Sequence, residues 1–197
     1  MKVVVLDRDG VINEDSDEYV KSVDEWIPIE GSIEAIAQLC EHGFTIAVAT
    51  NQSGIGRGYY SEDELEAMHE KMQALVESEG GQIATIAYCP HVPEDLCDCR
   101  KPQSGLFDQI ADTLGCDLEG AWVIGDSLRD LLAGTARGLL PILVRTGKGA
   151  KTEQKLATDE AEELVDVPVF DNLQEAAAYL IDSNPPDIVQ EWLDQEY

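Results

Sequence analysis

The sequence predicts an α/β protein built on a doubly wound, Rossmann-like and mostly parallel sheet with helices on both faces. Short apolar runs rich in β-branched residues, such as 3–6 and 44–50, alternate with segments whose apolar residues recur at helical spacing. Runs without polar alternation are typical of parallel strands that are buried on both faces. Strands that alternate with helices in this way form a doubly wound sheet. We expect one such domain over residues 1–182 and an acidic tail at 183–197.

Composition limits the class of protein. The chain has 197 residues, of which 44% are hydrophobic, and this suits one soluble domain with a substantial core. No apolar run approaches the roughly 20 residues of a membrane span, and the N-terminus enters a strand without a signal-peptide pattern, so we expect a cytoplasmic protein. The formal net charge is −27, from 40 acidic and 13 basic residues, which argues against binding to nucleic acids or anionic membranes.

Two predicted helices carry N-cap signals. Ser32 is expected to cap a helix at 32–42, and Ser61 is expected to cap one at 62–79. His69 on the second helix is expected at the surface or in a groove rather than at a metal. The other expected elements are strands at 2–6, 44–50, 83–88, 121–126, 141–145 and 167–170, helices at 105–114 and 172–182, and polar loops or linkers at 14–30 and 147–160.

Two carboxylates leave the carboxyl end of the first strand. Asp7 and Asp9 follow the apolar run directly, and Gly10 allows the chain to turn. Ligands of open α/β sheets bind just beyond this end of the strands. One carboxylate there can attack phosphorus as a nucleophile, a second can exchange a proton with the leaving group, and together they can hold a hard cation such as Mg²⁺. The alternative is a strand end with two solvated acids, because short acidic motifs are common.

A glycine-rich loop follows the strand at 44–50. It contains Thr50, Asn51, Gln52, Ser53 and Arg57, together with three glycines. Such a loop can turn backbone N–H groups toward a phosphate, although glycine loops also form ordinary turns. Basic residues are scarce in this chain, and those near expected strand ends or in turn-rich loops are candidates for holding an anion. They are Arg8, Arg57, Arg100, Lys101, Arg145 and Lys148.

Polar residues also follow the later strands. Asp126 ends the strand at 121–126, Asp130 lies four residues further on, and Lys101 follows the third strand after a short loop. Carboxylates can hold Mg²⁺, while a hydroxyl, an amide and a lysine can hold phosphate oxygens. Phosphoryl transfer depends mostly on positioning and on neutralisation of charge. The joint pattern is far more specific than any of its parts, and it predicts a phosphoryl-transfer site at the strand ends.

Four possible zinc ligands lie close together in the sequence. Cys89, His91, Cys97 and Cys99 form the pattern C-x-H-x₅-C-x-C. Structural Zn²⁺ sites use four tetrahedral sulfur and nitrogen ligands, and this set leaves no position for water, so the predicted zinc is structural. It would order a loop that has little apolar content and so place the two basic residues that follow. The alternative is a group of reduced cysteines beside an unrelated histidine.

The order of these motifs resembles the haloacid dehalogenase superfamily of phosphotransferases. The matching residues are D-x-D-G at 7–10, threonine at 50, lysine at 101 and G-D-x-x-x-D at 125–130. The resemblance implies a Rossmann-like domain with a minimal cap domain or none, here with a zinc-bound loop. It also implies that Asp130 supports either the metal or the lysine.

The resemblance further implies roles for individual side chains. Asp7 would be the nucleophile and Asp9 the general acid and base. Mg²⁺ would be held by Asp7, the backbone carbonyl of Asp9, and Asp126. Thr50 and Lys101 would bind the transferring phosphoryl group.

Longer strings narrow the resemblance within the superfamily. Residues 6–13, 49–55 and 89–102 resemble a subfamily of sugar-bisphosphate phosphatases that remove the C7 phosphate of a heptose 1,7-bisphosphate in nucleotide-heptose biosynthesis. The resemblance covers about residues 2–150 and implies that Arg100 and the loop at 52–57 contact the sugar or its remaining phosphate. It implies a small phosphorylated sugar as the partner, and we expect the chain to act as a monomer.

Three alternatives remain open at this point. Histidinol-phosphate phosphatases share the same motifs, including the Cys/His loop. A phosphoacceptor receiver domain also presents acids at strand ends, but it has no use for the second aspartate or for the zinc loop. A catalytically inactive binding module would not need all the chemical residues that are present.

Overall fold

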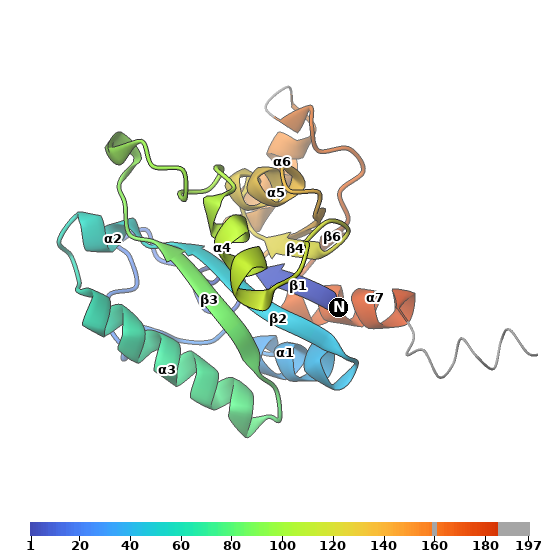
Figure 1. Cartoon of the computed structure of the whole chain (residues 1–197), viewed down its shortest axis with the longest axis horizontal. Helices are drawn as coiled ribbons and strands as arrows, with labels where there is room; N and C mark the ends of the chain where they lie inside the picture. The colour runs from blue at the N-terminus through green and yellow to red at the C-terminus, as the bar shows by residue number, and fades with distance from the viewer. Residues whose placement is uncertain (159–160, 185–197) are drawn as a thin grey trace, which may run out of the picture.

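A parallel six-stranded sheet forms the centre of the computed structural model, which describes residues 1–158 and 161–184. The strand order is β3-β2-β1-β4-β5-β6, and every neighbouring pair is parallel (Figure 1), so the predicted doubly wound sheet is confirmed. The predicted tail at 183–197 lies almost wholly outside the described residues. The strands are β1 (Lys2–Leu6), β2 (Phe44–Asn51), β3 (Ile83–Cys89), β4 (Trp122–Gly125), β5 (Leu140–Val144) and β6 (Val169–Phe170).

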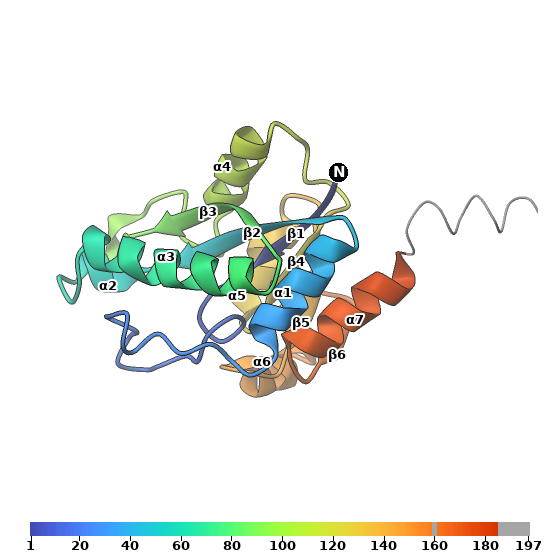
Figure 2. The same ribbon diagram turned by 90° about the horizontal axis from the view of Figure 1, so that it is seen from below.

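Helices cover both faces of the sheet, as Figure 2 shows. One face carries α1 (Ser32–Glu41), α3 (Glu62–Ser78) and α7 (Leu173–Ser183), and the other carries α4 (Gly105–Leu114), α5 (Leu128–Thr135) and α6 (Gly149–Leu156). The helices α1 and α7 lie side by side, although they come from opposite halves of the chain. Two short helical segments, α2 (Ser53–Gly56) and η1 (Pro93–Asp95), lie in loops. Among the described residues, no helix is long and apolar enough to cross a bilayer.

The first strand is buried on both faces because it lies in the middle of the sheet. Val4 and Leu6 pack into the core under α1 and α3, whereas Val3 and Val5 pack into the core under α4. Burial of a side chain of this size stabilises the fold by roughly 1.5–3 kcal/mol. The absence of polar alternation in β1 therefore reflects two packed faces.

The strand register brings the ends of three strands to one edge. Leu6 is opposite Val48 of β2 and Ile124 of β4, and the N–H of Asp7 donates to the carbonyl of Ile124 at 3.0 Å. The residues that follow these strands therefore emerge together. This edge is where the sequence predicts the site.

Some local predictions are wrong. The segment at 147–160 was expected to be a polar linker, but it contains α6, whose Leu156 packs beside the small third core. Helix α6 is mostly polar, so the sequence has no apolar stripe that would reveal it. Ser32 does not cap α1. The N-cap is Gly31 in a left-handed conformation, and the Ser32 hydroxyl donates to the carbonyl of Ile12 at 2.6 Å.

The N-cap predicted at Ser61 is confirmed, and it forms part of a capping box. The Ser61 hydroxyl accepts from the N–H of Glu64, and the Glu64 carboxylate accepts from the N–H of Ser61. The helix α5, which the sequence analysis did not identify, begins with a similar box between Ser127 and Asp130. That signal was present in the sequence as S-x-x-D.

A single lysine fastens the long loop at 14–30 to α3. The ammonium of Lys71 donates to the carbonyls of Val23 at 2.9 Å and Trp26 at 2.7 Å, and it lies 5.7 Å from the centre of the Trp26 ring. Trp26 is itself fully buried. The loop is therefore anchored by one cation and one large aromatic side chain.

We expect Lys71→Met to lower the free energy of unfolding by about 1–2 kcal/mol, because it removes two hydrogen bonds and keeps the aliphatic stem. Urea unfolding monitored by tryptophan fluorescence measures the change. Lys151→Met is the control, since Lys151 is exposed on α6 and its side chain makes no hydrogen bond or ion pair within the described residues. Equal stability of the two variants would contradict the anchoring role.

Candidate active site

A buried lysine connects two aspartates at the strand ends. The ammonium of Lys101 lies 2.9 Å from Oδ1 of Asp7 and 2.7 Å from Oδ1 of Asp130, and it donates to the carbonyl of Ala49 at 2.6 Å. Only 2% of the Lys101 side chain is exposed. Burial alone would lower the pKa of Lys101, but the charges of Asp130 and Asp7 raise it above its usual value. Lys101 is therefore a permanent cation, and its neighbours fix its position.

Asp130 is ionised because donors surround it. Its Oδ2 accepts from the hydroxyl of Ser127 at 2.7 Å and from the N–H of Ser127 at 3.1 Å. Burial by itself would raise the pKa of Asp130, but the charge and hydrogen bond of Lys101 and the Ser127 donors hold it below its usual range. Of the two roles that the resemblance implies for Asp130, this geometry favours support of the lysine.

Three carboxylates converge into a site suited to a cation. Oxygens of Asp7, Asp126 and Asp130 lie within 4.8 Å of one another. Burial, followed by repulsion from Asp130, raises the pKa of Asp7 to about 7. Burial, followed by repulsion from Asp7 and Asp130, raises the pKa of Asp126 to about 8. Buried acids that repel one another in this way are stabilised by a hard divalent cation, so the donor set fits Mg²⁺.

Backbone atoms crowd around Asp126 and fix its carboxylate. Its Oδ2 accepts from the N–H of Lys148 at 2.8 Å. Gly10 and Gly147 approach the same carboxylate so closely that a Cβ on either glycine would overlap Oδ2, and both glycines have positive φ. Only glycine meets both demands without strain.

The carboxylate of Asp9 accepts hydrogen bonds from three side chains. Its Oδ1 accepts from Arg8 at 2.9 Å and from Asn13 at 2.9 Å, and its Oδ2 accepts from Gln52 at 2.8 Å. Burial alone would raise the pKa of Asp9, but the charge of Arg8 and these hydrogen bonds lower it. Gln52 is held in turn by the hydroxyl of Tyr60, which donates to its Oε1 at 2.5 Å.

Some residues at the end of β2 and in the loop after it line the cavity, and others hydrogen-bond to the residues that line it. Gln52, Ser53 and Asn51 line the cavity. Asn51 also braces Lys101, because the Asn51 side chain accepts from the N–H of Lys101 at 3.0 Å and donates to the carbonyl of Lys101 at 3.1 Å. Thr50 is fully buried, and its hydroxyl accepts from Gln52 at 2.9 Å.

A cavity of about 250 Å³ opens above the aspartates. Two arginines, Arg100 and Arg129, line this cavity. The guanidinium of Arg100 donates to the carbonyl of His91 at 3.4 Å. Burial, followed by the nearby charge of Arg129, lowers the pKa of Arg100. Neither guanidinium has a carboxylate partner within the described residues, so the two repel each other and can share an anion.

Of the other predicted anion ligands, Lys148 lies at the cavity and the rest do not. Arg57 is exposed and does not line the cavity. Arg145 is paired with Glu153 and Asp171. Lys148 does line the cavity, with its ammonium 3.2 Å from Asp15. Arg8 is fully buried and serves Asp9 instead of an external anion.

The sequence analysis missed part of the cavity wall. Arg129 was overlooked inside the acidic motif at 125–130, although a lone arginine among acids was a visible signal. The loop at 14–30 also contributes, but it has no periodicity that would indicate its path. The residues from that loop are Asp15, Ser16, Asp17, Tyr19 and Val20.

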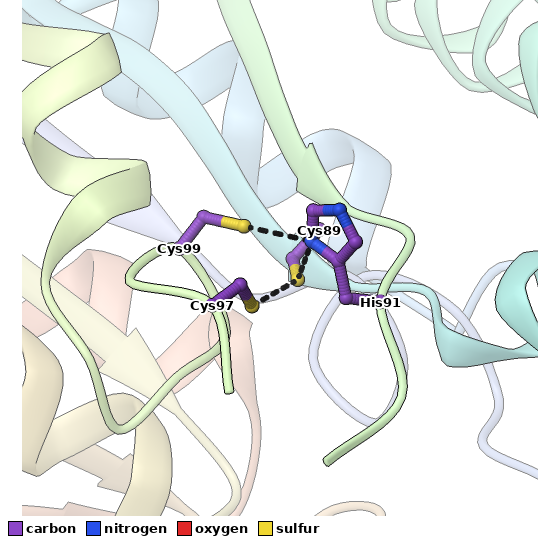
Figure 3. Close-up of side chains that lie close together, drawn as sticks. All are labelled: Cys89, His91, Cys97 and Cys99. Atoms are coloured by element: carbon purple, nitrogen blue, oxygen red, sulfur yellow. Dashed lines mark hydrogen bonds between the residues drawn. The ribbon is translucent and has the colours of Figure 1, made fainter. Parts of the chain in front are cut away.

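The four predicted zinc ligands converge (Figure 3). Their ligand atoms lie within 4.8 Å of one another, and Nδ1 of His91 lies 3.5 Å from the sulfur of Cys89 and 3.3 Å from the sulfur of Cys99. The sulfurs of Cys89 and Cys97 are 3.6 Å apart. A zinc tetrahedron with Zn–S bonds of about 2.3 Å has edges of about 3.8 Å, so this cluster has the right size for Zn²⁺.

The fold and the site together define a haloacid dehalogenase-type phosphotransferase. A family model described as HAD-hydrolase-like matches residues 98–176, and one described as polynucleotide kinase 3 phosphatase matches residues 2–128. The chain is 51% identical over 181 residues to the D-glycero-beta-D-manno-heptose-1,7-bisphosphate 7-phosphatase of Pseudomonas putida, covering 92% of this chain and 100% of the relative.

Further relatives agree. The enzyme of the same name from Neisseria meningitidis serogroup A is 49% identical over 184 residues, covering 93% of this chain and 97% of the relative. A crystal structure of D,D-heptose 1,7-bisphosphate phosphatase from B. bronchiseptica, complexed with magnesium and phosphate, has a TM-score of 0.86 and 43% identity, covering 93% of this chain and 100% of the other. The chain belongs to the HAD-like hydrolases, in the same family as these bisphosphate phosphatases.

We expect Mg²⁺ to raise the melting temperature more at about pH 8.5 than at about pH 6. The folded pKa values of Asp7 and Asp126, about 7 and about 8, exceed the unfolded value of 3.8, so these groups retain protons on folding and their contribution to stability falls as pH rises through this window. At the higher pH, Mg²⁺ relieves the repulsion between the ionised carboxylates of Asp7 and Asp126. At the lower pH, protons compete with Mg²⁺ for the same carboxylates, so the gain in melting temperature is smaller.

Thermal unfolding with and without Mg²⁺ at the two pH values measures the effect. Asp126→Asn is the comparison, because it removes one of the titrating ligands and should largely abolish the pH dependence of the Mg²⁺ effect. An equal gain at both pH values in the unsubstituted protein would show that these carboxylates do not hold the cation.

Proposed function

We propose that this chain is a Mg²⁺-dependent phosphatase that removes the C7 phosphate of D-glycero-D-manno-heptose 1,7-bisphosphate through an aspartyl-phosphate. The observation that carries the proposal is the placement of Asp7 beside buried Lys101, with Asp126 and Asp9 at the same strand ends. The names of the relatives supply the substrate. The product would serve the biosynthesis of nucleotide-activated heptose for surface polysaccharides.

The first half-reaction transfers the phosphoryl group to the protein. The phosphoryl group that is transferred would lie against Lys101 and the loop after β2. A carboxylate oxygen of Asp7 attacks phosphorus, the bond between phosphorus and the C7 oxygen breaks, and that oxygen takes a proton from Asp9. The dianionic substrate places negative charge near Asp9 and so raises its affinity for the proton that it donates.

The second half-reaction regenerates the enzyme. Asp9, now a carboxylate, accepts a proton from water as the water oxygen attacks phosphorus. The bond between phosphorus and Asp7 breaks, and inorganic phosphate leaves. Mg²⁺, held by Asp7, Asp126 and the Asp9 carbonyl, would neutralise charge on the phosphoryl group during both steps.

Charge at the cavity mouth supports a bisphosphate substrate. Arg100 and Arg129 repel each other in the absence of an anion, and a second phosphate would relieve that repulsion. Histidinol phosphate carries a cationic amine at its other end, so it would not relieve the repulsion between the two arginines. A nucleic-acid substrate, as in the name of the second family model, is disfavoured by the net charge of −27.

We further propose that the Cys/His cluster holds one structural Zn²⁺ and that the enzyme acts as a cytoplasmic monomer. A reducing compartment keeps zinc thiolates from forming disulfides. All the proposed catalytic groups come from one chain and one sheet edge, which supports a single domain acting alone. The carbonyl of the zinc ligand His91 accepts from Arg100, so the metal would also position an arginine at the cavity.

Asp7→Asn tests the proposal as a whole. An amide is nearly isosteric with the carboxylate but is a poor nucleophile, so we expect kcat to fall at least ~10³-fold with little change in melting temperature. Release of inorganic phosphate from heptose 1,7-bisphosphate, with and without Mg²⁺, measures the effect. Turnover near that of the unsubstituted enzyme would end the aspartyl-phosphate mechanism.

Arg100→Ala tests the choice of a bisphosphate. We expect kcat/KM for heptose 1,7-bisphosphate to fall by a factor that corresponds to about 1.5–3 kcal/mol of lost transition-state stabilisation, the range for a charge-assisted hydrogen bond. For p-nitrophenyl phosphate, which lacks a second anion, the loss should stay below about 1 kcal/mol. Arg137→Ala is the control, because Arg137 pairs with Asp108 away from the cavity. A uniform loss on both substrates would place Arg100 at the reacting phosphoryl group.

Cys97→Ser tests the zinc proposal. The purified protein should contain about one zinc per chain, and this variant should lose it and raise KM for the bisphosphate because Arg100 loses its support. Cys116→Ser, outside the cluster, should keep both zinc and KM. Elemental analysis decides first, and protein purified without chelator that contains no stoichiometric zinc would rule the site out.

A further inference from the structure

Arg8 is a buried cation whose only carboxylate partner within the described residues is the proposed general acid. Its side chain is 0% exposed, its Nη2 donates to Oδ1 of Asp9 at 2.9 Å, and its Nε has no partner. A buried charge is costly unless it is paired and hydrogen-bonded. The burial of Arg8 with one nitrogen unsatisfied therefore costs stability, which indicates that this arginine has a function other than stabilising the fold.

The second partner of Arg8 is a histidine from α3. Nη1 of Arg8 lies 3.3 Å from Nε2 of His69. His69 was expected at the surface or in a groove. It does line a groove beside Tyr88, but only 9% of it is exposed, and it lies in the buried stripe of α3 with Leu65 and Met68. The sequence signal was a histidine at helical spacing within an apolar stripe.

His69 is a neutral acceptor. Burial, followed by the charge of Arg8, lowers the pKa of His69 to about 3. A guanidinium only donates, so Nε2 of His69 accepts and the ring proton lies on Nδ1. A carboxylate at this position would compete with Asp9 for the charge of Arg8, whereas neutral imidazole orients the guanidinium and leaves that charge to Asp9.

We propose that His69 and Arg8 are positioning residues that hold the carboxylate of Asp9 in its working orientation. Arg8 and Asn13 together occupy both lone pairs of Oδ1, while Oδ2 accepts only from Gln52. Oδ2 is therefore the oxygen with a free lone pair, and it exchanges the proton with the leaving group. The inference rests on the proposed role of Asp9 as general acid and base.

The test compares His69→Leu with His69→Gln on two substrates. Leucine keeps the apolar volume and removes the acceptor, whereas glutamine keeps a neutral acceptor. An alkyl leaving group needs the proton from Asp9, but p-nitrophenolate leaves readily without it. We expect His69→Leu to lower kcat at least ~10-fold for heptose 1,7-bisphosphate and less than ~3-fold for p-nitrophenyl phosphate, while His69→Gln stays within ~3-fold on both.

Two further variants complete the design. Asp9→Asn gives the reference split between the substrates. His42→Leu controls for loss of a histidine, because His42 is a half-buried residue that follows α1 and does not line the cavity. If His69→Leu does not fold, Arg8→Lys takes its place in the test. Lysine keeps the charge but cannot contact both Asp9 and His69, so the variant should lose more kcat on heptose 1,7-bisphosphate than on p-nitrophenyl phosphate. Melting temperatures are recorded for every variant.

The outcomes separate this inference from the proposed function. Equal losses on the two substrates for His69→Leu, or the same loss for His69→Gln, would overturn the positioning role while leaving a split for Asp9→Asn intact. If Asp9→Asn itself shows no split, Asp9 is not the general acid, and both this inference and that part of the mechanism fail.

Discussion

The burial of Lys101 between two aspartates is the interaction on which the rest of the site depends. Its ammonium is held within 2.9 Å of Asp7 and within 2.7 Å of Asp130, and it is almost completely removed from water. A buried ion pair of this kind contributes little net stability, but the loss of Lys101 would leave two buried carboxylates without a compensating charge. The position of Lys101 determines which buried carboxylates can be ionised in the site. Asp7 shares this cation with Asp130, and Asp126 has no ion pair within the described residues, so burial and mutual repulsion still raise the pKa of Asp7 and of Asp126. A divalent cation would relieve that repulsion.

The acidic composition makes the few cations informative. With 13 basic residues against 40 acidic ones, a cation that lies away from surface acids is unusual. Arg145 and Arg137 are paired with neighbouring carboxylates at the surface. Arg100 and Arg129 instead stand together at the cavity. A net charge of −27 gives little long-range attraction for a polyanionic substrate, so in the proposed function these two arginines select the substrate at contact distance.

The sequence predicted what depends on local pattern and adjacency. The central strands were visible because β1 and β2 are buried on both faces, and Asp7 and Asp126 were visible because they end such strands. The Cys/His cluster was visible because its four members, Cys89, His91, Cys97 and Cys99, lie close together in the sequence. The sequence could not show that His69 reaches Arg8, since this contact joins residues 61 positions apart. Nor could it show the path of the loop at 14–30 or the mostly polar helix α6, because neither has an apolar period.

The contact between Gly10 and Gly147 has a consequence for engineering. The loops after β1 and β5 meet there backbone to backbone around Asp126, so these two positions tolerate no side chain. Lys148, by contrast, holds Asp126 through its main-chain N–H, while its exposed side chain lies at the cavity wall and pairs with Asp15. A combinatorial library aimed at new sugar phosphates would keep residues 10 and 147 constant and diversify position 148, where the backbone donor survives any replacement except proline.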